Sequence, residues 1–325
     1  MILEFDDACW NEESIDWKRG LLELLALLAN RNQHSLLARR EPMLSWCESH
    51  MPSHVDYFKA RLAAAQLRTN ALRILISVAG ADDVNSDPPW NLNVRSAYKL
   101  VNEPLRVVLE NDQSDRSFVE STIPSFASWC SKGWVQPVMG GGSVMKKKIS
   151  ITNSDSMARW RTFYLFDSDR LHPSELATGW TPPRGDGCQG HVFQSECGGM
   201  PAGRWHMLGR RSIENYLPEP LLMARNPAVT TALFNAAVGS MAEFYNYKKG
   251  LAGDGVHPIV ANQAIRAKRS QGFWVALPPP LPDELKHGYG NDVAEEFANV
   301  PPNHTWPLTI LTEMDQLSET LQDAI

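Results

Sequence analysis

The sequence contains few cysteines and no long apolar run. Its five cysteines among 325 residues are scattered and odd in number, which is typical of reduced thiols in a cytoplasmic protein and not of a disulfide framework. The densest apolar run, at 71–81, still carries Arg73 and is too short to cross a bilayer. The acidic first residues show no basic segment followed by an apolar core, so no secretory signal is visible. We therefore expect a cytoplasmic protein that does not enter a membrane.

The chain also has no large excess of charge. Charged residues make up 21% and hydrophobic residues 43%, which excludes wholesale disorder, and a net charge of −6 argues against a protein that coats nucleic acid nonspecifically. Residues 203–272 nevertheless carry nine Lys or Arg and four acids, whereas 273–325 carry one Lys and nine acids. This pattern fits either a polyanion-facing surface beside a partner-facing one or simple charge balance between neighbouring helices.

The apolar pattern divides the chain into three regions. Residues 1–93 are predicted to be helical, with a long helix at 55–78 and a linker in the Asp-, Asn- and Pro-rich stretch 80–93. Residues 219–325 are predicted to form a second helical region, first basic and then acidic. Between them, residues 104–218 have the pattern of a separate α/β domain.

Short apolar runs alternate with helical patterns in this central region. Strands are predicted at 105–109, 134–139, 162–166 and 205–208, and helices at 114–129 and 189–196. Such alternation indicates βαβ units. The predicted fold class is therefore α/β, with a parallel four-stranded sheet, helices on both of its faces, and helical regions flanking it at the N- and C-terminal sides.

Acidic side chains follow two of the predicted strands. Glu110 comes directly after the first, and Asp167 and Asp169 come directly after the third, where they point the same way if the extended geometry continues. Ligands of parallel sheets bind beyond the carboxyl ends of the strands. Each acid alone is a weak signal because Asp is common where strands become loops. Together they would repel one another without a divalent cation, and oxygen ligands favour Mg²⁺ or Mn²⁺ over zinc.

Three segments together resemble a Toprim domain. They are VLENDQSDRSFVE at 108–120, YLFDSDR at 164–170 and WHMLGRRSIENYLP at 205–218. The series is most similar to the Toprim nucleases of the OLD type found in bacterial anti-phage systems, and the IENYL segment narrows the resemblance to that branch. It covers about 104–218. It implies a Toprim catalytic domain and a metal-dependent nuclease that cleaves DNA or RNA as a defence effector.

The resemblance also implies which residues form the site. Glu110, Asp167 and Asp169 match the catalytic acids of the family, and Glu214 matches the acid of the closing segment. The implied metal ligands are Glu110, Asp115, Asp167, Asp169 and Glu214. They would hold two Mg²⁺ or Mn²⁺ ions about 3.5–4 Å apart, a spacing that stabilises the attacking and leaving oxygens of phosphoryl transfer.

Two positions depart from the family pattern. Asn111 stands where the family usually has Gly, and Asn also tolerates a positive φ. The second acid of the family lies one helical turn after the Glu. Here Asp112 and Asp115 are the candidates, and we assign the role to Asp115 because it begins the helical stretch.

Two basic groups are candidates for contact with a nucleic-acid backbone. One is the run of Lys146, Lys147 and Lys148 that follows three glycines, where exposed N–H groups and cations suit phosphate. The other is the pair Arg210 and Arg211, which either meets the scissile phosphate or forms salt bridges with the acids.

Other functions are open at the level of sequence. A D-x-D glycosyltransferase or a phosphohydrolase would use Asp167 and Asp169 alone and leave the glutamates unexplained, and a third alternative is a non-catalytic Toprim-fold assembly subunit. Cys188, His191, Cys197 and His206 have no zinc-ligand spacing. The sequence also has no G-x-x-x-x-G-K-[ST] motif, so any ATPase or sensor is expected on a partner chain, with a homo-oligomer as a further expectation.

Overall fold

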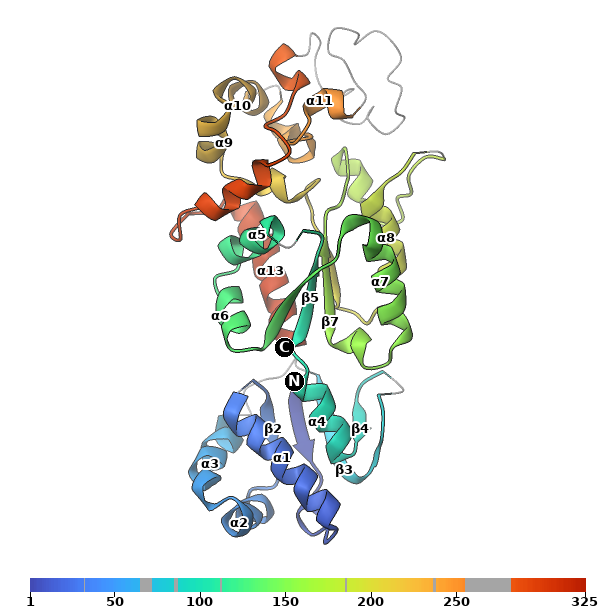
Figure 1. Ribbon diagram of the computed structural model, residues 1–325, viewed down its shortest axis with the longest axis vertical. Helices are drawn as coiled ribbons and strands as arrows, with labels where there is room; N and C mark the ends of the chain where they lie inside the picture. Colours follow the sequence, from blue (N-terminus) through green and yellow to red (C-terminus); the bar gives the residue numbers. More distant parts are fainter. Residues whose placement is uncertain are drawn as a thin grey trace.

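The computed structural model describes residues 1–31, 33–64, 72–84, 87–111, 113–184, 186–235, 238–254 and 282–325. The chain is elongated, with an N-terminal α/β unit at one end, a second α/β unit in the middle and a helical cap at the other end (Figure 1). Both termini lie between the two α/β units. Within the described ranges, no helix combines the length and apolar character needed to span a bilayer.

The N-terminal region is an α/β unit, so the prediction that residues 1–93 are helical is wrong. Its four-stranded sheet is parallel throughout and has the order β2-β1-β3-β4. The strands are β1 (Ile2–Phe5), β2 (Ser35–Leu37), β3 (Arg73–Ala81) and β4 (Trp90–Leu92). The helices are η1 (Asp7–Trp10), α1 (Ile15–Arg31), α2 (Arg40–His50), η2 (Pro52–His54), α3 (Val55–Ala64) and α4 (Val94–Asn102).

Short strands explain this error. Strands β2 and β4 have three residues each, which is too short to show an alternating pattern, and β4 lies inside the predicted linker. The helix predicted at 55–78 is described as α3 over Val55–Ala64, and the part of it from Arg73 onward is not helical. The apolar run after it forms β3, in which Ile74 and Ile76 are fully buried. Periodicity alone does not distinguish such a run from a buried helix.

The middle unit contains the parallel four-stranded sheet that the sequence predicts. Its strands are β5 (Leu105–Leu109), β6 (Val135–Met139), β7 (Thr162–Phe166) and β8 (Trp205–Met207). Their order is β6-β5-β7-β8, and every pairing is parallel. The chain is therefore α/β, but it has two four-stranded parallel sheets where one was predicted.

Helices cover both faces of this second sheet, as predicted. One face packs against α5 (Ser114–Thr122), α6 (Phe126–Ser131) and the C-terminal helix α13 (Leu308–Ala324), and the other against α7 (Gly142–Ser154) and α8 (Gln189–Cys197) (Figure 1). In β7, Phe163 and Leu165 face the first group of helices and Tyr164 and Phe166 face the second. The predicted helix at 114–129 is divided into α5 and α6, which is the effect expected of Pro124.

The cap is built from short helices in residues 219–254 and 282–299. They are α9 (Glu219–Arg225), α10 (Pro227–Phe234), η7 (Gly239–Phe244), α11 (Gly250–Gly253), η9 (Asp283–Lys286) and η10 (Val293–Asn299). The acidic segment at 283–299 therefore forms 3-10 turns and not one helix. Residues 255–281, which include much of the basic part of the predicted helical region, lie outside the described residues. Helix α13 does not belong to the cap, because its apolar side packs onto the middle sheet.

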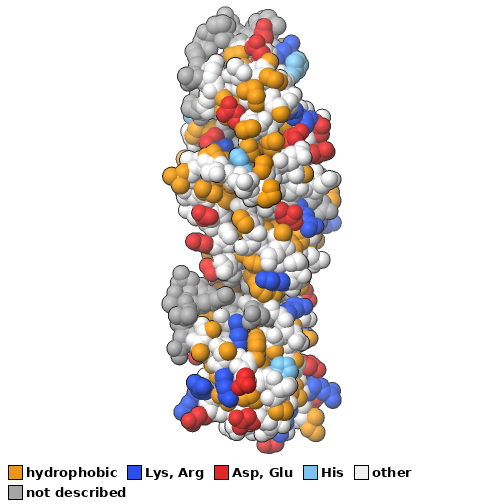
Figure 2. Space-filling view, turned by 90° about the vertical axis from the view of Figure 1, so that its left-hand side faces the viewer, with side chains coloured by type: hydrophobic (Ala, Val, Ile, Leu, Met, Phe, Trp, Pro, Cys, Tyr) orange, Lys and Arg blue, Asp and Glu red, His pale blue; other side chains and the backbone are white. Residues whose placement is uncertain are grey.

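The uneven charge of the sequence is partly balanced within the cap. Arg225, from the basic stretch, pairs with Asp292 and also with Glu296 at 3.0 Å, both from the acidic stretch. On the face seen in Figure 2, acidic and basic side chains are interspersed, and hydrophobic side chains gather over the upper half. These ion pairs favour charge balance between neighbouring elements as the origin of the pattern.

Candidate functional site

The candidate site lies where the connections of the middle sheet diverge. Strand β5 continues through α5 and α6 to the outer strand β6, whereas β7 continues through α8 to β8 on the opposite side. This point, beyond the carboxyl ends of two adjacent parallel strands, is the usual ligand position in such sheets. Glu110 follows β5 and Asp167 follows β7. The backbone N–H of Asp167 donates to Glu110 Oε1 at 3.2 Å, so the structure brings these two predicted residues together.

Asp115 and Glu214 join them from two further elements. Asp115 lies in the first turn of α5, where its Oδ2 accepts the backbone N–H of Asn111 at 2.9 Å. Glu214 lies in the 3-10 helix η6 (Ile213–Tyr216) and is almost completely buried. The backbone N–H of Ile213, beside Glu214, donates to Asp167 Oδ1 at 3.0 Å. Asp112, the other candidate for the second acid, lies outside the described residues.

These four carboxyl groups line one cavity of about 260 Å³. The cavity is bordered by the ends of β5 and β7, the first turns of α5 and α7, η6 and the start of η10. Its remaining walls come from Asn111, Gln113, Ser114, Gly142, Ile213, Lys248, Asn291, Asp292, Ala294 and Glu295. The cavity is therefore strongly acidic.

Asp169 lies beside this cavity and not in its wall. Its φ of 52° ends the extended geometry, so Asp167 and Asp169 do not continue one strand face as the sequence suggested. The side chain of Asp169 accepts the backbone N–H of Gly190, in the first turn of α8, at 3.1 Å. Its negative charge still reaches the cluster, since it contributes to raising the pKa of Glu110.

The clustered acids hold more negative charge than their surroundings compensate. Burial raises the pKa of Glu110 to about 7, and the charges of Asp169 and Asp115 add to this effect. Burial and the charge of Glu214 raise the pKa of Asp115 to about 6. Burial together with the charges of its acidic neighbours raises the pKa of Asp167 well above the ordinary range. Such a site is stabilised by a bound cation.

Lys248 is a cavity residue that the sequence analysis missed. Its Nζ lies 2.8 Å from Glu214 Oε1, and its side chain is 42% exposed whereas that of Glu214 is 2% exposed. Although burial opposes its charge, the Glu214 carboxylate raises the pKa of Lys248. Lys248 belongs to the cap, outside every segment that carried the resemblance, so no sequence signal pointed to it.

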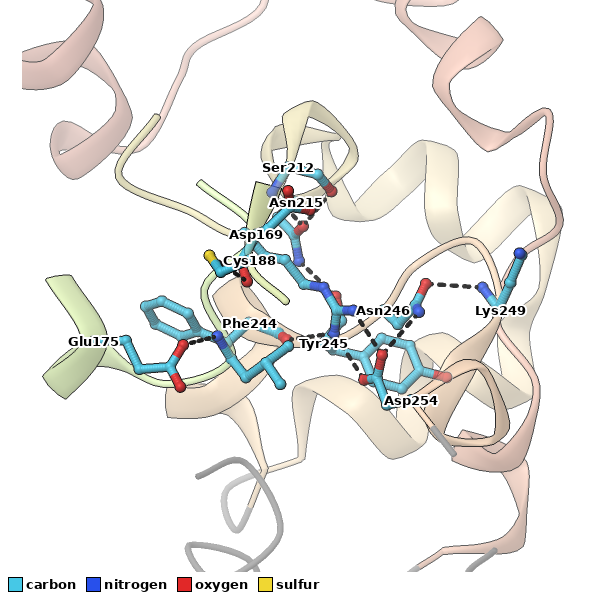
Figure 3. A network of polar contacts seen from close by, with 12 residues as sticks. Asp169, Glu175, Cys188, Ser212, Asn215, Phe244, Tyr245, Asn246, Lys249 and Asp254 are labelled. Carbon is cyan, nitrogen blue, oxygen red and sulfur yellow. Dashed lines mark hydrogen bonds and ion pairs between the residues drawn. The ribbon is translucent and has the colours of Figure 1, made fainter. Parts of the chain in front are cut away.

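The two candidate arginines form ion pairs with the cap. Arg211 binds both carboxyl oxygens of Asp254, at 2.6 and 2.7 Å. Asn246 donates to the same carboxyl group at 3.1 Å, and Figure 3 shows Asn246 and Asp254 pointing toward each other. Arg210 pairs with Glu243 at 2.9 Å. Neither arginine lines the acidic cavity, and the salt-bridge alternative describes both, with cap acids as the partners.

The three candidate lysines lie on α7, whose first residue Gly142 lines the cavity. Lys146 pairs with Glu196 of α8 at 3.1 Å, and Lys148 donates to the carbonyl oxygen of Met139. Lys146 and Lys147 are exposed. The helix therefore carries positive charge close to the cavity, with Lys147 directed to solvent.

The chemistry of the carboxylates fits Mg²⁺ or Mn²⁺, but their arrangement is not that of a preformed metal centre. In the described part of the chain, no group of three or more His, Cys, Asp or Glu side chains is placed to hold an ion. Three carboxyl oxygens of the cluster, one each from Glu110, Asp115 and Asp167, already accept backbone N–H groups, and Glu214 is paired with Lys248. Hard oxygen donors with unbalanced charge nevertheless suit a hard divalent cation.

Comparisons of this chain with protein-family models, with curated proteins and with solved structures found no match.

Proposed function

We propose that this chain is a Mg²⁺- or Mn²⁺-dependent nuclease whose middle unit is a Toprim-like catalytic domain. The observation that carries the proposal is the shared cavity of Glu110, Asp115, Asp167 and Glu214 at the point where the sheet connections diverge. Four carboxylates from four separate elements meet there. The resemblance implies that these acids share one site, and such a site is what phosphodiester cleavage through bound divalent cations needs.

Three of these acids are assigned to the cation. Glu110, Asp115 and Asp167 would hold it, and when bound it supplies positive charge to the phosphate oxygens and activates a water molecule. Asp167 is kept in place by the N–H of Ile213, and Glu110 by the N–H of Asp167. These hydrogen bonds orient the acids while leaving the other oxygen of each carboxylate available.

The cationic groups around the cavity are assigned to the substrate. The ammonium of Lys248 has three donors, so it can bind a phosphate oxygen while it remains bonded to Glu214. Lys146 and Lys147 on α7 extend positive charge outward from the cavity, along the direction in which a nucleic-acid backbone would lie. The role of Arg210 and Arg211 is to hold the cap above η6.

The alternative enzyme classes receive less support. A D-x-D glycosyltransferase or phosphohydrolase would need Asp167 and Asp169 to face one ligand. Asp167 instead accepts the backbone N–H of Ile213 and lines the cavity. Asp169 accepts the backbone N–H of Gly190 at the start of α8 and lies outside the cavity wall. The biological role that we propose is the effector of an anti-phage system, acting as a homo-oligomer or with a partner chain that provides the ATPase or sensor.

A substrate panel tests the enzyme class. The purified protein would be incubated with double- and single-stranded DNA, RNA, a sugar nucleotide and a phosphomonoester, each with Mg²⁺, Mn²⁺ or EDTA. We expect cleavage of at least one nucleic acid with metal and none with EDTA. Turnover of the sugar nucleotide or the phosphomonoester alone would contradict a nuclease. The absence of any turnover by the wild type would favour a non-catalytic assembly subunit.

A further inference from the structure

The acids of the cavity fall into two groups according to their counter-charge. Glu214 has an ammonium partner, because Lys248 Nζ lies 2.8 Å from its Oε1. Glu110, Asp115 and Asp167 form no ion pair with any Lys or Arg that the structure describes, although they line the same cavity. Lys248 is also the sole Lys or Arg among the described residues that line the cavity.

Backbone hydrogen bonds fix Lys248 over the site. Its carbonyl oxygen accepts the N–H of Gly290 at 3.1 Å, and the carbonyl of the preceding Tyr247 accepts the N–H of Tyr289 at 2.6 Å. Tyr247 is buried in the core of the cap, so the chain on the N-terminal side of the lysine is anchored as well. The ammonium is therefore a built-in charge of the cavity and not a surface lysine that reaches it by chance.

The cavity thus holds one ammonium group, which forms its ion pair with Glu214 and acts on Glu110, Asp115 and Asp167 only at longer range. We propose that Lys248 takes the place of one of the two expected metal ions, so that the site binds a single divalent cation between Glu110, Asp115 and Asp167. This inference rests on the proposed metal-dependent function, and it changes the number of divalent cations bound per chain from two to one.

The substitution Lys248→Met gives a direct prediction. It removes the ammonium but keeps an unbranched side chain of similar length, so Glu214 becomes a free carboxylate beside the other acids. We expect the variant to bind a second divalent cation, because the four carboxyl groups that line the cavity, Glu110, Asp115, Asp167 and Glu214, then have no Lys or Arg among the described cavity residues. Lys248→Arg keeps the charge and should leave the stoichiometry at one ion.

Lys249 provides the matched control. It is the next residue in the chain, is exposed, and does not line the cavity, so Lys249→Met makes the same change in net charge and side-chain type away from the site. The backbone N–H of Lys249 donates to Asn246 Oδ1, and this bond is unaffected by the substitution (Figure 3).

The experiment is isothermal titration with Mn²⁺ alone, cross-checked by the electron paramagnetic resonance signal of free Mn²⁺. We expect one ion per chain for the wild type, Lys248→Arg and Lys249→Met, and two for Lys248→Met. Two ions in the wild type would overturn the inference and leave the nuclease proposal intact, as would one ion in a folded Lys248→Met. No bound ion in the wild type, together with no metal-dependent cleavage, would overturn both. If Lys248→Met does not fold, the number of Mn²⁺ ions bound by the wild type still decides between one ion, as proposed, and two.

Discussion

Arg211 and Asp254 form a buried ion pair with two hydrogen bonds that joins the segment carrying Glu214 to the cap carrying Lys248. Their side chains are only 15% and 12% exposed. Arg211 also donates to the carbonyl oxygen of Phe244, and its own carbonyl accepts the N–H of Asp169. One pair of residues thus connects the end of β7, η6 and the cap.

Breaking this pair should destabilise the protein. Asp254→Ala leaves the Arg211 guanidinium charged and without its carboxylate partner, and removing one member of a buried pair costs about 3–5 kcal/mol. The free energy of unfolding from urea titration should fall by that amount. The exposed acid Asp315 of α13 serves as the control, because Asp315→Ala should change it by less than about 0.5 kcal/mol. Equal values for the two variants would show that the pair has no structural role.

Without metal, stability should fall as the pH rises through the acidic range. Burial and neighbouring acids raise the pKa of Glu110 from 4.5 to about 7 and that of Asp115 from 3.8 to about 6. Because both groups keep their protons in the folded protein at pH values where the unfolded chain has lost them, their contribution to stability is fully present below about pH 4 and is lost as the pH rises to about 7.

Melting temperatures measured in EDTA between pH 4 and pH 8 test this sign. Glu110→Gln removes one of the carboxyl groups whose pKa is raised in the folded protein. The melting temperature of this variant should therefore change less with pH than that of the wild type, and it should be higher at pH 8. A wild-type melting temperature that rises from pH 5 to pH 7, with no difference for the variant, would mean that these carboxyl groups ionise normally in the fold.

Asp169 should respond differently to two small substitutions. Its φ of 52° is tolerated by Asn and costs more for Ala, and its side chain accepts the N–H of Gly190. Asp169→Ala loses both advantages and should lower the free energy of unfolding by about 1–3 kcal/mol, whereas Asp169→Asn keeps the conformation and an acceptor oxygen and should cost less than half of that. Chemical denaturation of both variants makes the comparison, and an equal loss would contradict the role of the backbone.

Glu313 should position the IENY segment from the C-terminal helix. Its carboxylate accepts three hydrogen bonds, from Gly209 at 2.7 Å, from Tyr216 at 2.7 Å and from His206 at 3.0 Å. Glu313→Ala should therefore cost about 3 kcal/mol in unfolding free energy, since the buried Tyr216 and the partly buried Gly209 and His206 all lose their acceptor. Tyr216→Phe should cost about 1–2 kcal/mol in the same measurement. A neutral Glu313→Ala would show that α13 does not hold this segment.

The sequence predicted the middle sheet closely, and the reasons are physical. The runs at 105–109 and 162–166 are strands buried on both faces, so they are apolar apart from Arg106 and Thr162, and their ends are sharply marked by Glu110 and Asp167. Because parallel strands place their carboxyl ends at one edge, the meeting of these acids followed from the strand assignment alone. The break between α5 and α6 is not visible in the apolar spacing, which continues at helical intervals across Pro124.

The features that the sequence did not reveal depend on contacts between distant segments. Lys248 reaches Glu214 because the cap folds over η6, and Arg211 is turned toward Asp254 by the same packing. Neither pairing has a local pattern. In the N-terminal unit, strands of three residues are too short to show a periodic pattern. Strand β1 has four residues, and it forms through its pairing with β2 and β3, which are distant in sequence.

The measurement that tests the proposed activity most directly is the Mn²⁺-dependent cleavage rate of Asp167→Asn beside Asp315→Asn. The amide keeps the shape of Asp167 and its bond from Ile213, so the variant should fold and melt at or above the wild-type temperature while losing the charge that holds the cation. We expect cleavage by Asp167→Asn to fall by about a thousandfold or more and cleavage by Asp315→Asn to equal that of the wild type. Wild-type cleavage by a folded Asp167→Asn would contradict the assignment of this cavity as the nuclease site.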